Sequence, residues 1–306
     1  MKTQLSISLG LSILFSGCHL SFGDAPHAPS SRFLPLEAIS ESIFDQPHDL
    51  VLSPDGKYLL VADLGNNEIK VLDAESLILK EQFGKADLDS PHDLIFTQKG
   101  LLLVADSGNN RIAIYTMSGT RGTLSGTLQA DLDSPEGVSE GADGRIYVTS
   151  TKDHRLVAFK DGGKVAEKGK DGDSREKLNR PHDVLVDADG RIWIADAGNN
   201  RILEMNSDFS LVQILGGPGY SFNEPKYLAL NKEGWLFVAD EFNHQIRVLD
   251  NNRRPRFGIS GGVNLKNQEF ALKQPEGVVV SELNLWVSDT RNNRILRLKL
   301  PTPEKR

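Results

Sequence analysis

The 306-residue sequence has little cysteine, few aromatic residues and no long apolar run. Its single cysteine is Cys18, so disulfides cannot stabilise the fold, which must rest on a hydrophobic core. No stretch approaches the roughly 20 apolar residues that a membrane-spanning helix needs. The formal net charge is -7, and Lys and Arg are scattered along the chain. This distribution argues against a nucleic-acid partner.

The first residues are organised as a targeting segment. Lys2 precedes an apolar stretch from Leu5 to Phe15, and small residues lead to the cysteine. The sequence Phe15-Ser16-Gly17-Cys18 resembles a bacterial lipobox, in which the cysteine becomes a lipidated N-terminus after cleavage. We therefore predict a lipoprotein-type signal peptide at 1–17, a palmitate-type membrane anchor at Cys18 and a place in the bacterial cell envelope. Ordinary signal-peptide cleavage would give a secreted protein instead.

The remainder divides into a tether, a repetitive body and a short tail. Residues 18–35 are rich in Ser, Pro, His and Ala without an apolar period, which predicts a tether. Residues 36–300 form the body, and 301–306 the tail. One sequence pattern recurs six times in the body, and the prolines that begin successive copies are 44 to 50 residues apart. We call the copies units one to six; their head residues are Pro47, Pro91, Pro135, Pro181, Pro225 and Pro275.

Short strand patterns separated by turn residues fill these units, and no segment has a helical period. Four strands in about 45 residues, repeated radially, are typical of a β-propeller. We predict an all-β fold, a six-bladed β-propeller of four-stranded antiparallel blades. The last unit has only three strand patterns, so the apolar segment Phe33 to Ile43 is expected to complete its blade. The charged segment Lys160 to Arg175 is expected to be a solvated loop.

The residue after each head proline differs from unit to unit and therefore carries the functional information. Equivalent positions in a radial repeat should form one ring at the channel mouth, which would be either a metal site or a polar lid. Three imidazoles with an open fourth position suit a zinc-type ion. The Asp that follows each His should point to the opposite side of its strand. In chain order the ring residues are His48, His92, Glu136, His182, Lys226 and Glu276.

A second repeated pattern follows the second strand of each unit. The copies Val104 to Ile112 and Ile194 to Ile202 both read as apolar residues, Ala-Asp, two small residues and Asn-Asn-Arg-Ile. We interpret the Asp and Asn residues as turn architecture, with the Arg bridging to a neighbouring blade. The pattern resembles the NHL repeat, which implies a six-bladed propeller whose first strand in each repeat lines the channel.

The chain is also similar to the peptidyl-α-hydroxyglycine amidating lyase family, whose propeller holds zinc through histidines in Pro-His heads. This resemblance implies His48, His92 and His182 as zinc ligands. The tyrosine which those enzymes use has no counterpart in the matching loops, where this chain has Leu64, Ser107, Ala197 and Glu241.

Three functions are compatible with the sequence. The first is a monomeric envelope propeller that binds a small-molecule ligand, peptide or partner protein at its channel mouth. The second is a metal-dependent enzyme, with Glu136 or Glu276 as general base and Lys226 as electrostatic stabiliser. The third is a structural scaffold without a ligand.

Overall fold

The computed structural model describes residues 30–129, 131–169 and 175–301. The predicted signal peptide, Cys18, the first part of the tether and residues 302–306 lie outside these ranges, so the predictions made for them stay predictions. Within the described residues, no helix is long and apolar enough to cross a membrane.

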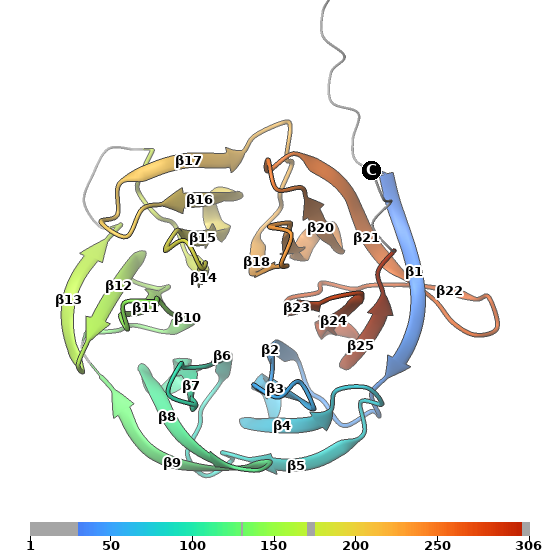
Figure 1. The fold of residues 1–306 in the computed structure, drawn as a ribbon, viewed down its shortest axis with the longest axis horizontal. Coiled ribbons are helices and arrows are strands. Elements are labelled where there is room, and N and C mark those ends of the chain that lie inside the picture. Colours follow the sequence, from blue (N-terminus) through green and yellow to red (C-terminus); the bar gives the residue numbers. More distant parts are fainter. Residues whose placement is uncertain (1–29, 130, 170–174, 302–306) are drawn as a thin grey trace, which may run out of the picture.

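Four separate four-stranded antiparallel sheets surround a central axis (Figure 1). Each corresponds to one of units one to four. Unit one contains β2 (Pro47–Leu52), β3 (Tyr58–Asp63), β4 (Glu68–Asp73) and β5 (Leu79–Phe83). Unit two contains β6 (Pro91–Phe96), β7 (Leu101–Asp106), β8 (Arg111–Ser118) and β9 (Arg121–Leu128). Unit three contains β10 (Pro135–Glu140), β11 (Ile146–Ser150), β12 (Arg155–Lys160) and β13 (Gly163–Lys168). Unit four contains β14 (Pro181–Val186), β15 (Ile192–Asp196), β16 (Arg201–Met205) and β17 (Leu211–Gly216).

Units five and six share a nine-stranded sheet with the N-terminal strand. Strand β1 (Ser30–Ile39) runs parallel to β21 (Pro255–Val263) and antiparallel to β25 (Arg294–Lys299), so it lies between the two units (Figure 1). It begins inside the segment predicted as a tether. The other strands are β18 (Pro225–Leu230), β19 (Leu236–Asp240), β20 (Gln245–Leu249), β21 (Pro255–Val263), β22 (Glu269–Ala271), β23 (Val278–Ser281), β24 (Asn284–Asp289) and β25 (Arg294–Lys299).

The prediction of an all-β propeller with four-stranded antiparallel blades is confirmed. The expectation of a solvated loop from Lys160 to Arg175 is wrong for part of that segment, because β13 pairs with β12 there. Lys164 and Glu167 are exposed on β13, the outermost strand of the sheet, where charged side chains protect a free edge. The charge of this segment therefore reflects an edge strand.

The Asn-Asn turns join each unit to the next. A short 3-10 helix starts most of these turns: η1 (Leu64–Asn66), η2 (Ser107–Asn109), η3 (Ala197–Asn199), η4 (Glu241–Asn243) and η5 (Thr290–Asn292). The residue that follows each 3-10 helix has a left-handed backbone conformation, which Asn and His tolerate. Its side chain accepts a hydrogen bond from the backbone N–H that precedes the next head proline. The accepting residues are Asn67, Asn110, His154, Asn200, His244 and Asn293.

The repeated Asp at the end of the second strand of each unit forms hydrogen bonds that hold neighbouring segments together. Asp106, for example, is fully buried; its Oδ1 accepts the backbone N–H of Asp89 (2.7 Å) and its Oδ2 accepts Arg111 Nε (2.6 Å). These contacts agree with the interpretation as turn architecture. Arg111 and its equivalents bind the Asp of their own unit and a backbone carbonyl in the segment that precedes their head proline. For Arg294 this carbonyl belongs to Ala271 of β22, which pairs with β21 of unit five, so here the expected bridge is present. The repeated link between units comes from the second Asn.

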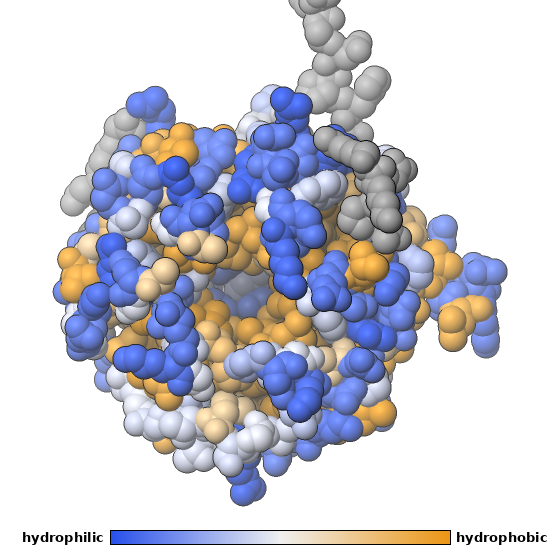
Figure 2. All heavy atoms as spheres, viewed as in Figure 1, coloured by the Kyte–Doolittle hydropathy of each residue, from blue (hydrophilic) through white to orange (hydrophobic). Residues whose placement is uncertain are grey.

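The hydrophobic core lies between successive sheets. Leu60 and Val71 of unit one, for example, pack in one cluster with Leu102 and Tyr115 of unit two. This packing leaves the inner strands free to line a central channel, and the space-filling view shows the molecule hollowed at its centre (Figure 2).

Candidate functional site: the channel mouth

An irregularity at the start of the inner strands determines which side chains face the channel. In units one to five the strand register shifts directly after the head proline. Such a bulge interrupts the alternation of side chains between the two faces of a strand. A His and the Asp that follows it can therefore both approach the axis, at different depths.

Asp49, Asp93 and Asp183 were expected on the side of their strands opposite the preceding His. The charges of Asp93 and Asp183 act on Asp49, and that of Asp93 acts on Asp183, so the carboxyl groups of three units instead lie near one another. Burial, reinforced by this proximity, raises the pKa of Asp49 and Asp183 well above the usual range. Burial also raises the pKa of Asp93 to about 6. Asp93 Oδ2 accepts the Val138 N–H (2.5 Å), which ties unit two to unit three.

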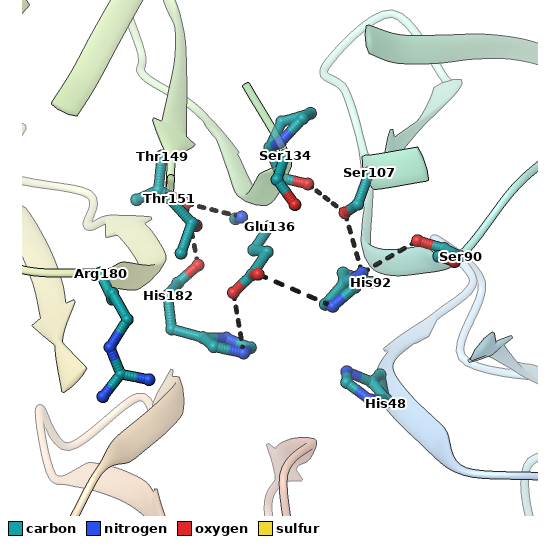
Figure 3. A network of polar contacts seen from close by, with 12 residues as sticks. His48, Ser90, His92, Ser107, Ser134, Glu136, Thr149, Thr151, Arg180 and His182 are labelled. Atoms are coloured by element: carbon teal, nitrogen blue, oxygen red, sulfur yellow. Dashed lines mark hydrogen bonds and ion pairs between the residues drawn. The ribbon is translucent and has the colours of Figure 1, made fainter. Parts of the chain in front are cut away.

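All six ring residues predicted from the head positions line a single cavity of about 480 Å³. The three imidazole rings lie close together: the centroid of His48 is 4.6 Å from that of His92 and 6.4 Å from that of His182. His182 Nε2 lies 3.1 Å from Glu136 Oε2, and His48 Nδ1 lies 3.1 Å from Glu276 Oε2. Figure 3 shows His92 and His182 on either side of the Glu136 carboxyl. The repeat therefore brings imidazole and carboxyl groups into direct contact.

Burial sets the charge of these groups. It lowers the pKa of His48 and His182 well below the ordinary value and that of His92 to about 4, so all three imidazoles are neutral at pH 7. Burial raises the pKa of Glu136 to about 7 and that of Glu276 to about 8. The neutral imidazoles have nitrogen lone pairs that can bind a cation. The raised pKa values of the two carboxyl groups show that the cavity holds too little positive charge to stabilise both carboxylates.

Lys226 supplies only part of that charge. Burial lowers its pKa, but the carboxyl groups of Glu276, Glu241 and Glu136 outweigh this effect and raise it. Its ammonium lies 3.4 Å from Glu241 and 3.6 Å from Glu224. Lys226 is therefore positioned by the rim carboxylates rather than in direct contact with Glu136 or Glu276.

Part of the ring fits a divalent cation. One potential ligand atom from each of His48, His182 and Glu276 lies within 4.8 Å of the other two, and all three residues are buried. Glu276 Oε2 lies 3.1 Å from His48 Nδ1 and 4.0 Å from His182 Nε2, so both imidazoles present a nitrogen to the same carboxylate oxygen. The contact of His48 Nδ1 with Glu276 does not have hydrogen-bond geometry, and a cation between these atoms would satisfy this buried nitrogen. Two imidazoles and a carboxylate are donors that zinc accepts.

The rim of the cavity contains residues which the sequence analysis did not identify. Arg180 pairs with Glu224 (2.6 Å), and Arg291 is held by the amide oxygens of Gln274 (3.0 Å) and Gln46 (3.2 Å). Further rim residues of this kind are Thr151, Lys152 and His154. Many of these residues directly precede a head proline or follow the strand-end Asp. Comparing those two positions across the units, as was done for the head position, would have identified them.

The aromatic residues of unit five separate into core and rim. Phe222 and Tyr227 are buried, whereas Phe242 is 42% exposed and lines the cavity. The Tyr227 ring meets that of His182 edge-on at 4.9 Å, and its hydroxyl donates to the Glu136 carbonyl (3.3 Å). Tyr227 thus supports two members of the ring from below.

Fold and site together define a β-propeller with a polar, partly buried cavity at one end of its channel. The model of the NHL repeat family matches residues 88–115, 178–204 and 272–298. The chain therefore contains NHL repeats, as the motif predicted. No curated relative matches the sequence.

Several solved structures are similar in fold. Virginiamycin B lyase from Staphylococcus aureus is 16% identical, with a TM-score of 0.62 over 88% of this chain and 98% of that one. An auxiliary nutrient binding protein from Bacteroides thetaiotaomicron is 15% identical, with a TM-score of 0.66 over 83% of this chain and 69% of that one. Hydrazine synthase from Kuenenia stuttgartiensis is 12% identical, with a TM-score of 0.62 over 85% of this chain and 97% of that one. These likenesses show a shared fold.

Proposed function

We propose that the protein binds a small polar ligand, or a side chain of a peptide or partner protein, at the mouth of its channel. One observation carries the proposal: all six head residues line the same cavity of about 480 Å³, a size typical of small-molecule sites. Charges of both signs surround it, and Phe242 adds an exposed aromatic face. The nutrient binding protein of the same fold is consistent with this function.

The same proposal places a divalent cation of the zinc type on the floor of the site. His48, His182 and Glu276 would hold it, and the approach of His48 Nδ1 (3.1 Å) and His182 Nε2 (4.0 Å) to Glu276 Oε2 supports its presence. When bound, the cation supplies a Lewis acid that attracts carbonyl, carboxylate or hydroxyl oxygens of a ligand.

Zinc binding to the purified protein tests the cation site. After dialysis against a small excess of zinc, about one equivalent should remain with the wild type, and His48→Ala and His182→Ala should each lose it. His244→Ala is the matched control, because His244 accepts a backbone N–H in a turn. Loss of zinc in the control, or retention in both site variants, would contradict the assignment.

Ligand binding needs a separate test. Thermal shifts of the zinc-loaded protein would be recorded with a panel of dipeptides, hydroxy acids and monosaccharides. A compound that raises the unfolding temperature should lose its effect in Arg291→Ala, which alters the rim but none of the proposed cation ligands. A panel without any positive compound would leave the scaffold function as the better account.

A metal-dependent lyase or hydrolase is the second candidate. It is favoured by Glu136, whose carboxyl lies 3.1 Å from His182 Nε2 and has a pKa raised to about 7 by burial. A carboxyl with such a pKa can take up and release a proton at neutral pH, as a general base must. Glu276 is the alternative base if it does not hold the cation, and Lys226 would stabilise negative charge. Turnover that disappears in Glu136→Gln while zinc is retained would support this candidate.

We further propose that the nine-stranded sheet comprises the fifth and sixth blades, joined through β1. The six equivalent links between units support this count, since Asn293 of the last unit accepts the N–H of Gln46 in the first (2.9 Å). The protein is proposed to act as a monomer in the bacterial envelope, with Cys18 carrying the lipid. Incorporation of labelled palmitate should be lost in Cys18→Ser.

A further inference from the structure

The three histidines of the ring have different surroundings, although the repeat gives them equivalent positions. The group that can share a cation contains His48 and His182 but not His92. The His92 side chain is 14% exposed, against 10% for His48 and 5% for His182. His92 is therefore outside the group that can share a cation, although its ring centroid is only 4.6 Å from that of His48.

The contacts of His92 fix its orientation. Its Nδ1 lies 2.9 Å from the Ser90 carbonyl oxygen and 2.8 Å from Ser107 Oγ (Figure 3). Ser107 Oγ also lies at hydrogen-bond distance from the Pro135 carbonyl, to which it can only donate. Since the Ser107 proton goes to Pro135, Ser107 Oγ accepts from His92. Nδ1 must therefore carry the proton.

A protonated Nδ1 leaves Nε2 of the neutral imidazole as an acceptor. This atom lies on the side of Glu136, 3.9 Å from its Oε1, a separation too long for a direct hydrogen bond. His48 Nδ1 and His182 Nε2, by contrast, each lie 3.1 Å from a carboxylate oxygen, of Glu276 and of Glu136. In the described part of the ring, His92 is the histidine whose Nδ1 proton is fixed by a backbone carbonyl and a serine hydroxyl.

We infer that His92 does not hold the cation, and that its Nε2 is a fixed acceptor for a hydroxyl or N–H donor of the bound ligand. This inference deepens the proposed function and, in its cation part, rests on it. It differs from the equal role that the sequence predicts for the three histidines. The inferred ligand therefore has two groups: a hydroxyl or N–H that donates a hydrogen bond to His92 Nε2, and an oxygen atom that coordinates the cation.

Acylation by diethyl pyrocarbonate tests the division of roles, because the reagent attacks a free imidazole nitrogen. In the zinc-loaded protein, peptide mapping should show His48 and His182 protected at least tenfold relative to the zinc-free protein. The rate at His92 should change less than twofold. Equal protection of all three histidines would overturn the inference and leave the cation site itself intact.

Zinc affinity gives a second readout. His92→Ala should change the dissociation constant for zinc less than about threefold, whereas His48→Ala should weaken binding at least 100-fold. A loss in His92→Ala as large as that in His48→Ala would refute the inference. If the wild type binds no zinc, the cation part of the proposed function fails, and the orientation of His92 is decided by the following measurement.

Nitrogen-15 NMR of the histidine side chains reports the tautomer without any cation. The wild type should show His92 protonated at Nδ1, and Ser107→Ala should shift this signal. Thr290→Val is the matched control, because Thr290 Oγ1 donates to the Pro47 carbonyl (2.8 Å) as Ser107 does to Pro135, and within the described residues no hydrogen bond joins it to a histidine. A wild-type His92 protonated at Nε2 would overturn the inference.

Discussion

The cation beside the strand-end Asp differs between units, and this difference provides a stability test. In unit two, Arg111 binds Asp106. In unit one, the equivalent of Arg111 is Glu68, and Lys70 binds both Asp63 and Glu68 instead. Lys70, Asp63 and Glu68 are all at most 4% exposed. Lys70 therefore neutralises two buried carboxylates in unit one.

Replacing Lys70 by Ala leaves these two carboxylates buried without a cation. Removal of one partner from a buried ion pair costs about 3–5 kcal/mol, and we expect a loss of this size in the free energy of unfolding. The double variant Glu68→Arg, Lys70→Ala reproduces the arrangement of unit two, where Ala113 stands at the position of Lys70. It should recover most of the loss, because Arg would then bind Asp63 and the second carboxylate is gone.

Urea unfolding followed by tryptophan fluorescence measures both effects. Trp286 packs in the same cluster as Leu59 and donates to the Ala74 carbonyl (2.8 Å), so its emission reports on unit one. Lys57→Ala is the control, since the Lys57 side chain is 73% exposed. An unchanged midpoint in Lys70→Ala, or a double variant no more stable than the single one, would refute the reasoning.

Two further predictions concern pH and a buried glycine. In the cation-free protein, burial raises the folded-state pKa of Glu276 to about 8 and that of Glu136 to about 7, above the ordinary range of a glutamate. The folded state therefore binds more protons than the unfolded state, and stability should fall as pH rises from 6.5 to 8. His92, whose pKa is lowered to about 4, makes stability rise with pH, but only below pH 6.5. Glu276→Gln should therefore flatten the decline of the urea midpoint between pH 6.5 and 8. An unchanged decline in this variant would contradict the raised pKa of Glu276. In Gly277→Ala the new Cβ would lie 2.4 Å from the His48 carbonyl oxygen, and the free energy of unfolding in urea should fall by about 1–3 kcal/mol or more. Gly126→Ala is the control, because its Cβ would be 3.8 Å from the nearest atom. Its free energy of unfolding should stay within about 1 kcal/mol of the wild type.

The repetitive part of the fold could be predicted from the sequence because every unit repeats the same strand and turn signals. The turn residues Asp106 and Asn110 have the same partners in each unit that keeps them, so one correct interpretation applies to the whole ring. The head ring was predictable for the same reason, and all six of its residues line the cavity.

The parts that could not be predicted depend on local departures from regular geometry. The register shift after each head proline brings Asp49 and Asp93 toward the axis, and no alternation pattern reveals it. The different environments of His92 and His48 depend on Ser107, a loop residue whose equivalents are not conserved in type between units. Ring membership follows from the repeat, but hydrogen-bond partners do not.

The placement of β1 has a mechanical consequence. Because β1 is hydrogen-bonded on one side to β21 and on the other to β25, a pull along its axis from the N-terminal end loads both ladders in shear. Many backbone hydrogen bonds would then have to break together, whereas a terminal strand pulled sideways is unzipped one bond at a time. If the propeller is held at its N-terminus, a pulling force would therefore act on the nine-stranded sheet. The outer edge of the ring would carry this force, away from the histidines of the channel.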